Sequence, residues 1–236
     1  MIPLDWLRGA FARLSAPERE RLAAWRGVQE ADPAKAHGEE RFVVVDVESS
    51  GLDVFHDRLI AIGAVAVGGE RIRVADHYYA VLRQAVASDE ANILVHGIGG
   101  TAQVQGEDPR QALLAFLEFA GKSPLVAFHA PFDEIMLRRA MRRYLGEPFR
   151  RAWLDLAWLA PALDPERAKS LRSLDEWVRA CGIDNARRHH ALADALATAQ
   201  LLLVLQSKAQ SRGVRTTGEL LDAARGQEWA TPRRPR

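Results

Sequence analysis

The order of the segments along the chain predicts a mixed α/β protein in which helices cover a central sheet. After residue 40, three segments with strand character follow one another, at residues 42–47, 59–67 and 71–82, and two glycines between the second and the third favour a hairpin. Helices and short strands then alternate to residue 206. With 236 residues, of which 48% are hydrophobic, the chain is long enough to bury one substantial core.

The predicted elements rest on apolar spacing and on capping residues. The first strand is almost continuously apolar, as is typical of a strand in the middle of a sheet. Pro131 suits the first turn of a helix, and Ser173 with Glu176 forms a capping-box pattern. Residues 83–108 are predicted to be irregular or to hold short helices. The other predicted helices are 110–120, 132–145, 154–163, 173–181 and 190–206, and the other strands are 125–128 and 149–155.

We predict three parts in the chain. Residues 1–40 form a helical N-terminal extension and linker, residues 41–206 the main domain, and residues 207–236 a polar C-terminal tail that is partly disordered. The extension holds two short helices and the linker 31–40. We expect this hairpin to pack on the main domain, and the alternative is a partner-binding role. The tail has room for a short helix near residues 219–224.

Composition restricts the classes of protein to which the chain can belong. The single cysteine, Cys181, excludes an internal disulfide and a cysteine-based metal site. No apolar run approaches the ~20 residues that a membrane span needs, and the N-terminus has no signal-peptide pattern. We therefore expect a soluble, cytoplasmic protein without membrane contact. The net charge of +1 does not by itself indicate a nucleic-acid partner.

Asp46 and Glu48 stand at the end of the first predicted strand, where alternate residues point to the same face. Two neighbouring carboxylates repel each other and resist removal from water. A divalent cation such as Mg²⁺ or Mn²⁺ would compensate both charges, because hard cations prefer oxygen ligands. Hydration of both acids at an exposed strand end is the alternative.

Two further acids stand at helix starts. Asp133 falls in the first turn of a predicted helix, where an acid also favours the helix dipole. Asp194 is the one acid in a helix of Ala, Leu and Thr, which indicates close packing at a site. His189 precedes it by five residues, an offset of roughly 140° on a continuous helix. The two side chains converge better if His189 lies in the preceding loop or at the helix start.

Together these segments resemble the DEDDh exonucleases. The similarity is to the DnaQ-like group, which includes the proofreading subunit of bacterial replicative DNA polymerase. Three motifs of that family match Asp46-Val47-Glu48-Ser49-Ser50-Gly51-Leu52, Ala130-Pro131-Phe132-Asp133 and His189-His190-Ala191-Leu192-Ala193-Asp194. His96-Gly97-Ile98 resembles a fourth element. The resemblance covers about residues 41–205. It departs at Ser49-Ser50, where Thr-Thr is usual, and at His129, where Asn is common.

The resemblance implies a ribonuclease-H-like fold and a 3′–5′ exonuclease that releases nucleoside 5′-monophosphates. Asp46, Glu48, Asp133 and Asp194 would hold two divalent cations, Mg²⁺ or Mn²⁺, and His189 would be the general base. The residues expected to border the terminal nucleotide are Ser49, Ser50, Gly51, Leu52, His96, Ile98 and Phe132. Leu52 and Ile98 would contact a base face.

The expected partner is nucleic acid, at single-stranded or frayed DNA 3′ ends, with a polymerase or another replication or repair protein as a second expected partner. RNA is the alternative substrate. An inactive, binding subunit is a further alternative, although all five motif residues are present. Arginines that follow Asp133 suggest a track for phosphates, with a solvated basic surface as the alternative. They are Arg138, Arg139, Arg142 and Arg143, joined by Arg150, Arg151, Arg187 and Arg188.

Overall fold

The computed structural model describes residues 14–185 and 188–231. Three predictions fall outside these ranges: most of the first helix, around Leu4 to Phe11, the position of Arg187 and the disorder of the last residues. Among the described residues, no helix combines the length and the apolar character that crossing a bilayer requires.

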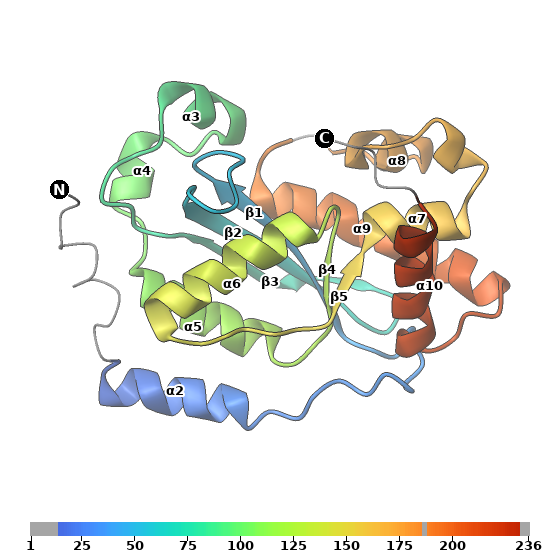
Figure 1. The fold of residues 1–236 in the computed structure, drawn as a ribbon, viewed down its shortest axis with the longest axis horizontal. Helices are drawn as coiled ribbons and strands as arrows, with labels where there is room; N and C mark the ends of the chain where they lie inside the picture. Colours follow the sequence, from blue (N-terminus) through green and yellow to red (C-terminus); the bar gives the residue numbers. More distant parts are fainter. Residues whose placement is uncertain (1–13, 186–187, 232–236) are drawn as a thin grey trace.

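A five-stranded mixed sheet forms the centre of the molecule (Figure 1). Its strands are β1 (Phe42–Ser49), β2 (Leu59–Val67), β3 (Ile72–Val81), β4 (Leu125–Ala127) and β5 (Trp153–Asp155). The strand order is β3-β2-β1-β4-β5. The first three strands pair antiparallel as a meander, whereas β4 is parallel to β1 and β5 is parallel to β4. The predicted fold class, α/β with a mixed central sheet, is confirmed.

Helices cover both faces of the sheet. One face carries α5 (Pro109–Ala120) and α6 (Pro131–Leu145), with α2 (Ala16–Arg26) outside them. The other face carries α9 (Ala191–Ser211). The remaining helical segments are α3 (Glu90–His96), α4 (Gly100–Val104), α7 (Leu156–Leu163), the 3-10 turn Arg167–Lys169, α8 (Leu174–Ala180) and α10 (Thr217–Ala230).

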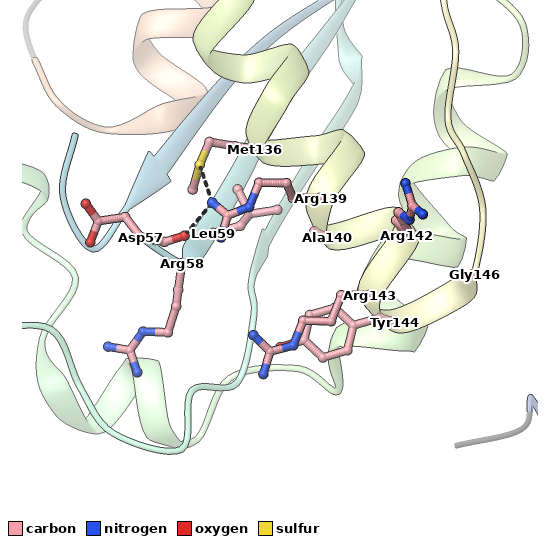
Figure 2. A pocket seen from close by; sticks show the side chains of 10 residues that line it. All are labelled: Asp57, Arg58, Leu59, Met136, Arg139, Ala140, Arg142, Arg143, Tyr144 and Gly146. Carbon is pink, nitrogen blue, oxygen red and sulfur yellow. Dashed lines mark hydrogen bonds between the residues drawn. The ribbon is translucent and has the colours of Figure 1, made fainter. Parts of the chain in front are cut away.

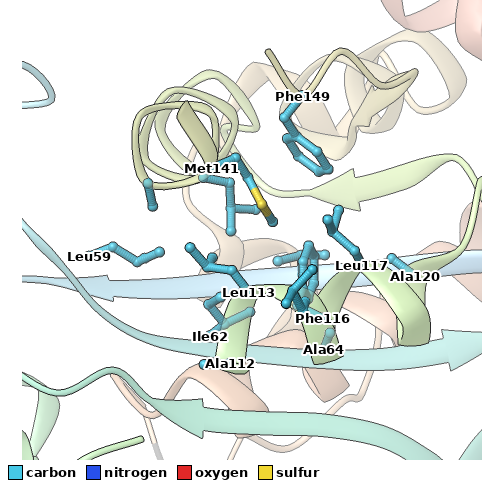
Figure 3. Close-up of a cluster of buried hydrophobic side chains, with 14 of the residues drawn as sticks. Leu59, Ile62, Ala64, Ala112, Leu113, Phe116, Leu117, Ala120, Met141 and Phe149 are labelled. Atoms are coloured by element: carbon cyan, nitrogen blue, oxygen red, sulfur yellow. The ribbon is translucent and has the colours of Figure 1, made fainter. Parts of the chain in front are cut away.

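The two faces hold separate apolar cores, because alternate residues of β1 point in opposite directions. Val43, Val45 and Val47 face the core that α5 and α6 close. Figure 3 shows part of this core, with Leu113 and Phe116 of α5 among the buried side chains. Phe42 and Val44 face the core beneath α9. Asp46 and Glu48 continue this second series, so β1 directs them to the α9 side.

The observed boundaries differ from the predicted ones mainly in the second half of the chain. The strand predicted at 149–155 is only Trp153–Asp155, because β5 pairs solely with the three residues of β4. The region 83–108 contains α3 and α4, in agreement with the short helices expected there.

The N-terminal segment packs on the main domain, as expected. Leu22 and Trp25 of α2 are buried in the core with α5, and Trp25 donates a hydrogen bond to the carbonyl of Gly121 (2.8 Å). The predicted linker is not free either. His37 is 1% exposed, and Ala36 forms a β-bridge with Thr216.

The prediction of a polar C-terminal tail from residue 207 is wrong for most of that segment. Helix α9 continues to Ser211, and α10 is longer than the helix predicted at 219–224. Thr216 and Glu219 form a capping box that starts α10. Leu220 and Leu221 then enter the same core as α7 and α9. Few apolar residues suffice here because they recur on one face of the helix.

Candidate active site

Asp46 and Glu48 lie at the carboxyl end of β1, as the sequence predicts. They share the face of the strand that turns toward α9, and both are half-buried. β4 runs parallel to β1, so the carboxyl ends of both central strands meet at this edge of the sheet. The loop after β4 leads directly into α6 and Asp133, which brings a third acid to the same edge.

Gly63 of β2 allows the start of α9 to approach the sheet. Gly63 pairs with Asp46 across the β1–β2 ladder. A Cβ atom at this position would lie 2.3 Å from the carbonyl carbon of Ala191 and 2.3 Å from the nitrogen of Leu192. Only glycine leaves room for this contact, and the contact carries Asp194, in the first turn of α9, to the end of β1. A lone glycine inside a strand was the available sequence signal, but sequence reasoning missed its role.

Three carboxylates form one cluster. Ligand atoms of Asp46, Glu48 and Asp194 all lie within 4.8 Å of one another. Two donors hold the Asp194 carboxylate: the side-chain amide of Asn185 binds Oδ1, and the backbone N–H of His189 donates to Oδ2 (2.8 Å). Asn185 was not predicted, because it lies nine residues before Asp194 in a loop whose path the sequence does not specify.

Asp133 lies beside this cluster. It occupies the first turn of α6, is 5% exposed, and accepts a hydrogen bond from the backbone N–H of Val47 (3.1 Å). It is not one of the three residues whose ligand atoms gather within 4.8 Å. Its negative charge nevertheless acts on Asp46, whose pKa it helps to raise.

Burial and mutual repulsion oppose the ionisation of these acids. Burial is the main cause that raises the pKa of Asp46 and Asp133 well above the usual range, and neighbouring carboxylates raise both further. Burial, with Asp194 nearby, raises the pKa of Glu48 to about 7. In residues 14–185 and 188–231, no lysine or arginine forms an ion pair with any of the four acids.

The donor set fits a hard divalent cation. The Oε1 atom of Glu48 is buried without a hydrogen-bond partner among the described residues, so this oxygen can bind a ligand. Clustered carboxylate oxygens are the ligands that Mg²⁺ and Mn²⁺ prefer. A bound cation would also remove the repulsion that raises the pKa values of these acids.

The two histidines of the third motif have different surroundings. His189 is exposed and lies in the loop before α9, as predicted, with a left-handed backbone (φ 57°). Its backbone contact with Asp194 fixes it next to the cluster. His190 is half-buried, and its ring stacks on Tyr79 of β3 with the ring centroids 5.1 Å apart. The neighbouring histidines therefore serve different parts of the structure.

The end of β1 and the loop that follows it contain four of the predicted substrate-binding residues. Ser49 is buried, and its hydroxyl donates to the carbonyl of Gly51 (2.5 Å). Ser50 donates to Asp57 (2.8 Å) and accepts from the backbone N–H of Arg58 (2.9 Å). These bonds shape a tight loop, in which the side chain of Leu52 is 88% exposed.

The other predicted substrate residues are less accessible. His96 is 3% exposed, with Nε2 bonded to Asn92 (2.8 Å) and Nδ1 accepting from the backbone of Ile98 (2.9 Å). Ile98 is 7% exposed and packs with Ile60 and Ala61. In this conformation both residues support the end of α3. Of the two residues expected to contact a base, Leu52 is exposed and Ile98 is buried in this conformation. Phe132 is half-buried against the α5–α6 core.

A pocket of about 210 Å³ opens beside the cluster and includes Asp46 and Asp194. Its other lining residues are Phe128, His129, Ser173, Leu174, Asp175 and Arg188, of which only Arg188 belongs to the predicted phosphate track. Arg188 pairs with Asp175 (2.6 Å), which joins the loop before α9 to α8. His129 has a left-handed backbone (φ 64°) and projects where the second motif of the family commonly has Asn.

The arginines of α6 do not form one uniform surface. Arg139 is half-buried, and its guanidinium donates to the carbonyls of Val54 (2.5 Å) and Asp57 (2.9 Å). Arg138 lies 3.7 Å from Glu134 on the same helix. Arg142 and Arg143 line a pocket farther along α6 (Figure 2). Arg151 is also engaged, since it pairs with Glu30 (2.5 Å).

Comparisons with known proteins agree with this geometry. Residues 43–202 match the exonuclease family RNase_T. A DNA polymerase III PolC-type protein of Thermotoga maritima is 31% identical over 183 residues, which cover 78% of this chain and 13% of the relative. A DNA polymerase III subunit epsilon-like protein of Rhodobacter capsulatus is 30% identical over 187 residues, covering 78% of this chain and 26% of the relative.

Solved structures share the fold. Escherichia coli exonuclease I in complex with a dT13 oligonucleotide superimposes with a TM-score of 0.63 at 20% identity, over 74% of this chain and 43% of that one. The chain therefore spans a small part of the curated relatives and less than half of this structural neighbour. At such low identity the structural likeness establishes the fold alone, and it confirms the ribonuclease-H-like arrangement that the motifs implied.

Proposed function

The chain belongs to the RNase_T exonuclease family, and on that premise we propose that it is a metal-dependent 3′–5′ exonuclease acting on DNA. It would hydrolyse the terminal phosphodiester bond of a single-stranded or frayed 3′ end and release a nucleoside 5′-monophosphate. The observation that carries the proposal is the convergence of Asp46, Glu48 and Asp194 at the end of β1, with a buried Glu48 oxygen that lacks a partner.

Asp46, Glu48 and Asp194 would hold divalent cations, Mg²⁺ or Mn²⁺. Asp133 would add a fourth negative charge beside them. When bound, such cations stabilise the negative charge that develops on the phosphodiester and on the attacking water. Asn185 and the backbone of His189 hold Asp194 in place, so this carboxylate does not need to reorganise when the cations bind. Four acids suit two cations, because each cation offsets two negative charges.

His189 would act as the general base. Its imidazole is exposed, and its backbone contact with Asp194 keeps it beside the acidic cluster. The ring would take a proton from the water as its oxygen bonds to phosphorus. The bond from phosphorus to the 3′-oxygen then breaks, and that oxygen gains a proton from solvent. Leu52, exposed in the loop after β1, would contact the terminal base without reading its identity.

A partner among replication or repair proteins remains part of the proposal. The relatives from Thermotoga maritima and Rhodobacter capsulatus are named as DNA polymerase III proteins, which supports a polymerase as that partner. Bacterial replication relatives also support the expectation of a cytoplasmic location.

A nuclease assay on labelled oligomers tests the proposal. We expect stepwise shortening of 5′-labelled single-stranded DNA with Mg²⁺ or Mn²⁺, release of 5′-monophosphates and no reaction in EDTA. A circular single strand should survive. An RNA oligomer in the same assay reports sugar choice, and Asp194→Asn is the inactive control because it keeps the shape of the side chain. Rapid cutting of circles, or full activity after metal removal, would overturn the proposal.

A further inference from the structure

A second pocket lies away from the acidic cluster, between α6 and the end of the loop that follows β1 (Figure 2). Its volume is about 570 Å³, larger than that of the pocket beside the cluster. Its lining includes Asp57, Arg58, Arg139, Arg142 and Arg143, together with the carbon-rich side chains of Leu59, Met136, Ala140 and Tyr144.

The positive charge of this pocket is largely unpaired. In the described part of the chain, neither Arg58 nor Arg143 forms an ion pair, and the two side chains extend toward the same side in Figure 2. The one acid of the lining, Asp57, already accepts hydrogen bonds from Ser50 (2.8 Å) and from the backbone N–H of Asp53 (2.8 Å). Arg143 also lies over the ring of Tyr144, with its Cζ atom 5.4 Å from the ring centroid.

The pocket is tied to the catalytic edge of the sheet by two connections. Helix α6 carries Asp133 in its first turn, beside the cluster, and reaches the pocket at Arg143, ten residues later, or about 15 Å along the helix axis. Arg139 holds the loop that follows β1 through Val54 and Asp57. A strand of nucleic acid covers this distance in roughly four nucleotides at about 3.4 Å each, and in fewer when it is extended.

We propose that this arginine pocket binds the phosphodiester backbone of the same strand whose 3′ end lies at the acidic cluster, a few nucleotides before the scissile bond. This proposal rests on the proposed function, because it takes the bound strand to be the substrate of the exonuclease. Guanidinium groups bind phosphate oxygens with paired hydrogen bonds, and the apolar floor of the pocket suits sugars and bases. An unpaired basic groove lined by an aromatic side chain is typical of sites that follow a single strand.

The double variant Arg58→Gln/Arg143→Gln tests the proposal, while Arg139 is left intact because it supports the loop. The matched control is Arg71→Gln/Arg73→Gln, which changes the net charge equally at the exposed hairpin end of β3. Fluorescence anisotropy would measure the binding of a labelled dinucleotide and of a twelve-nucleotide oligothymidylate. Hydrolysis of the p-nitrophenyl ester of thymidine 5′-monophosphate, which is too short to reach the pocket, would report the acidic site independently.

We expect the pocket variant to bind the twelve-nucleotide strand about tenfold more weakly at low salt. The slope of log affinity against log salt concentration should become shallower by about 0.7 for each lost phosphate contact. Binding of the dinucleotide and hydrolysis of the ester should match wild type. Unchanged binding of the long strand, or an equal loss in the control variant, would overturn the proposal. If wild type hydrolyses neither ester nor DNA while the pocket variant still loses binding, the proposed function fails and the arginine pocket stands.

Discussion

The two ends of α6 present opposite charges in opposite environments. At its start, Asp133 joins a half-buried group of acids that no lysine or arginine of the described residues neutralises. Near its end, Arg143 and the neighbouring Arg58 are also unpaired, but they lie in an open pocket. Burial raises the pKa of the acids, whereas no carboxylate of the described residues forms an ion pair with Arg58 or Arg143. The difference indicates that the acidic end is built for cations and the basic end for an exchangeable anion.

The largest expected effect comes from the acidic end. Asp194→Ala should abolish detectable hydrolysis and weaken cation binding, because it removes one of the three clustered ligand groups. Single-turnover kinetics and metal titration would measure both losses. Asp175→Ala, in the adjacent pocket, is the control and should retain cation binding. If Asp194→Ala binds cations and cleaves DNA as wild type does, the cluster is not the catalytic site.

The next effect separates His189 from His190. His189→Asn should lower turnover by ~10²–10⁴-fold, the usual range for loss of a general base, while cations and DNA still bind. Asparagine tolerates the left-handed backbone at this position and keeps the N–H that holds Asp194. His190→Phe is the matched control, since a phenyl ring can maintain the stacking on Tyr79, and it should stay active. The reverse pattern would show that the roles of the two histidines are exchanged.

A smaller effect is expected at Gly63, which touches no substrate. Gly63→Ala places a methyl group against the backbone of Ala191 and Leu192, so the start of α9 must move and carry Asp194 with it. We expect a stability loss of about 1–3 kcal/mol, lower cation affinity and reduced turnover. Gly68→Ala is the control, because its nearest neighbouring atom would be 3.8 Å from the added carbon. A stable, fully active Gly63→Ala protein would exclude the positioning role of this glycine.

Much of this arrangement was predictable from local sequence rules. The period of two along a strand placed Asp46 and Glu48 on one face, and the helical offset of roughly 140° favoured His189 in the loop before the helix or at the helix start. The contacts of Asn185 and Arg139 were not predictable, because they depend on loop paths and on which helix faces which loop. Gly63 carried a signal, but its partner across space could not be identified from the sequence.

The C-terminal helix and the His96 region show two further limits. α10 was underestimated because only a few apolar residues mark it, and their burial depends on α7 and α9, which lie far away in the sequence. His96 belongs to a motif that resembles a substrate-contacting element, yet both of its ring nitrogens are bonded inside the protein. Motif order predicts which residues gather near a site, whereas side-chain exposure depends on the packing around them.

Thermal unfolding with and without Mg²⁺ tests the central claim, that the acidic cluster holds divalent cations. The folded-state pKa of Glu48, about 7, lies above its ordinary value of 4.5. Between pH 4.5 and about 7, the Glu48 carboxyl therefore binds more protons in the folded protein than in the unfolded chain. The stability that this group contributes is lost as the pH rises through about 7. Wild type in EDTA should melt at a lower temperature at pH 8 than at pH 5.5.

Mg²⁺ should raise the melting temperature at pH 8 more than at pH 5.5, because protons compete for the carboxylates at the lower pH. In the Glu48→Gln variant, Mg²⁺ should raise the melting temperature much less, and the melting temperature in EDTA should depend less on pH. That result would support cation binding by the cluster. Equal melting temperatures with Mg²⁺ and EDTA at pH 8, in a protein that still hydrolyses DNA, would contradict it.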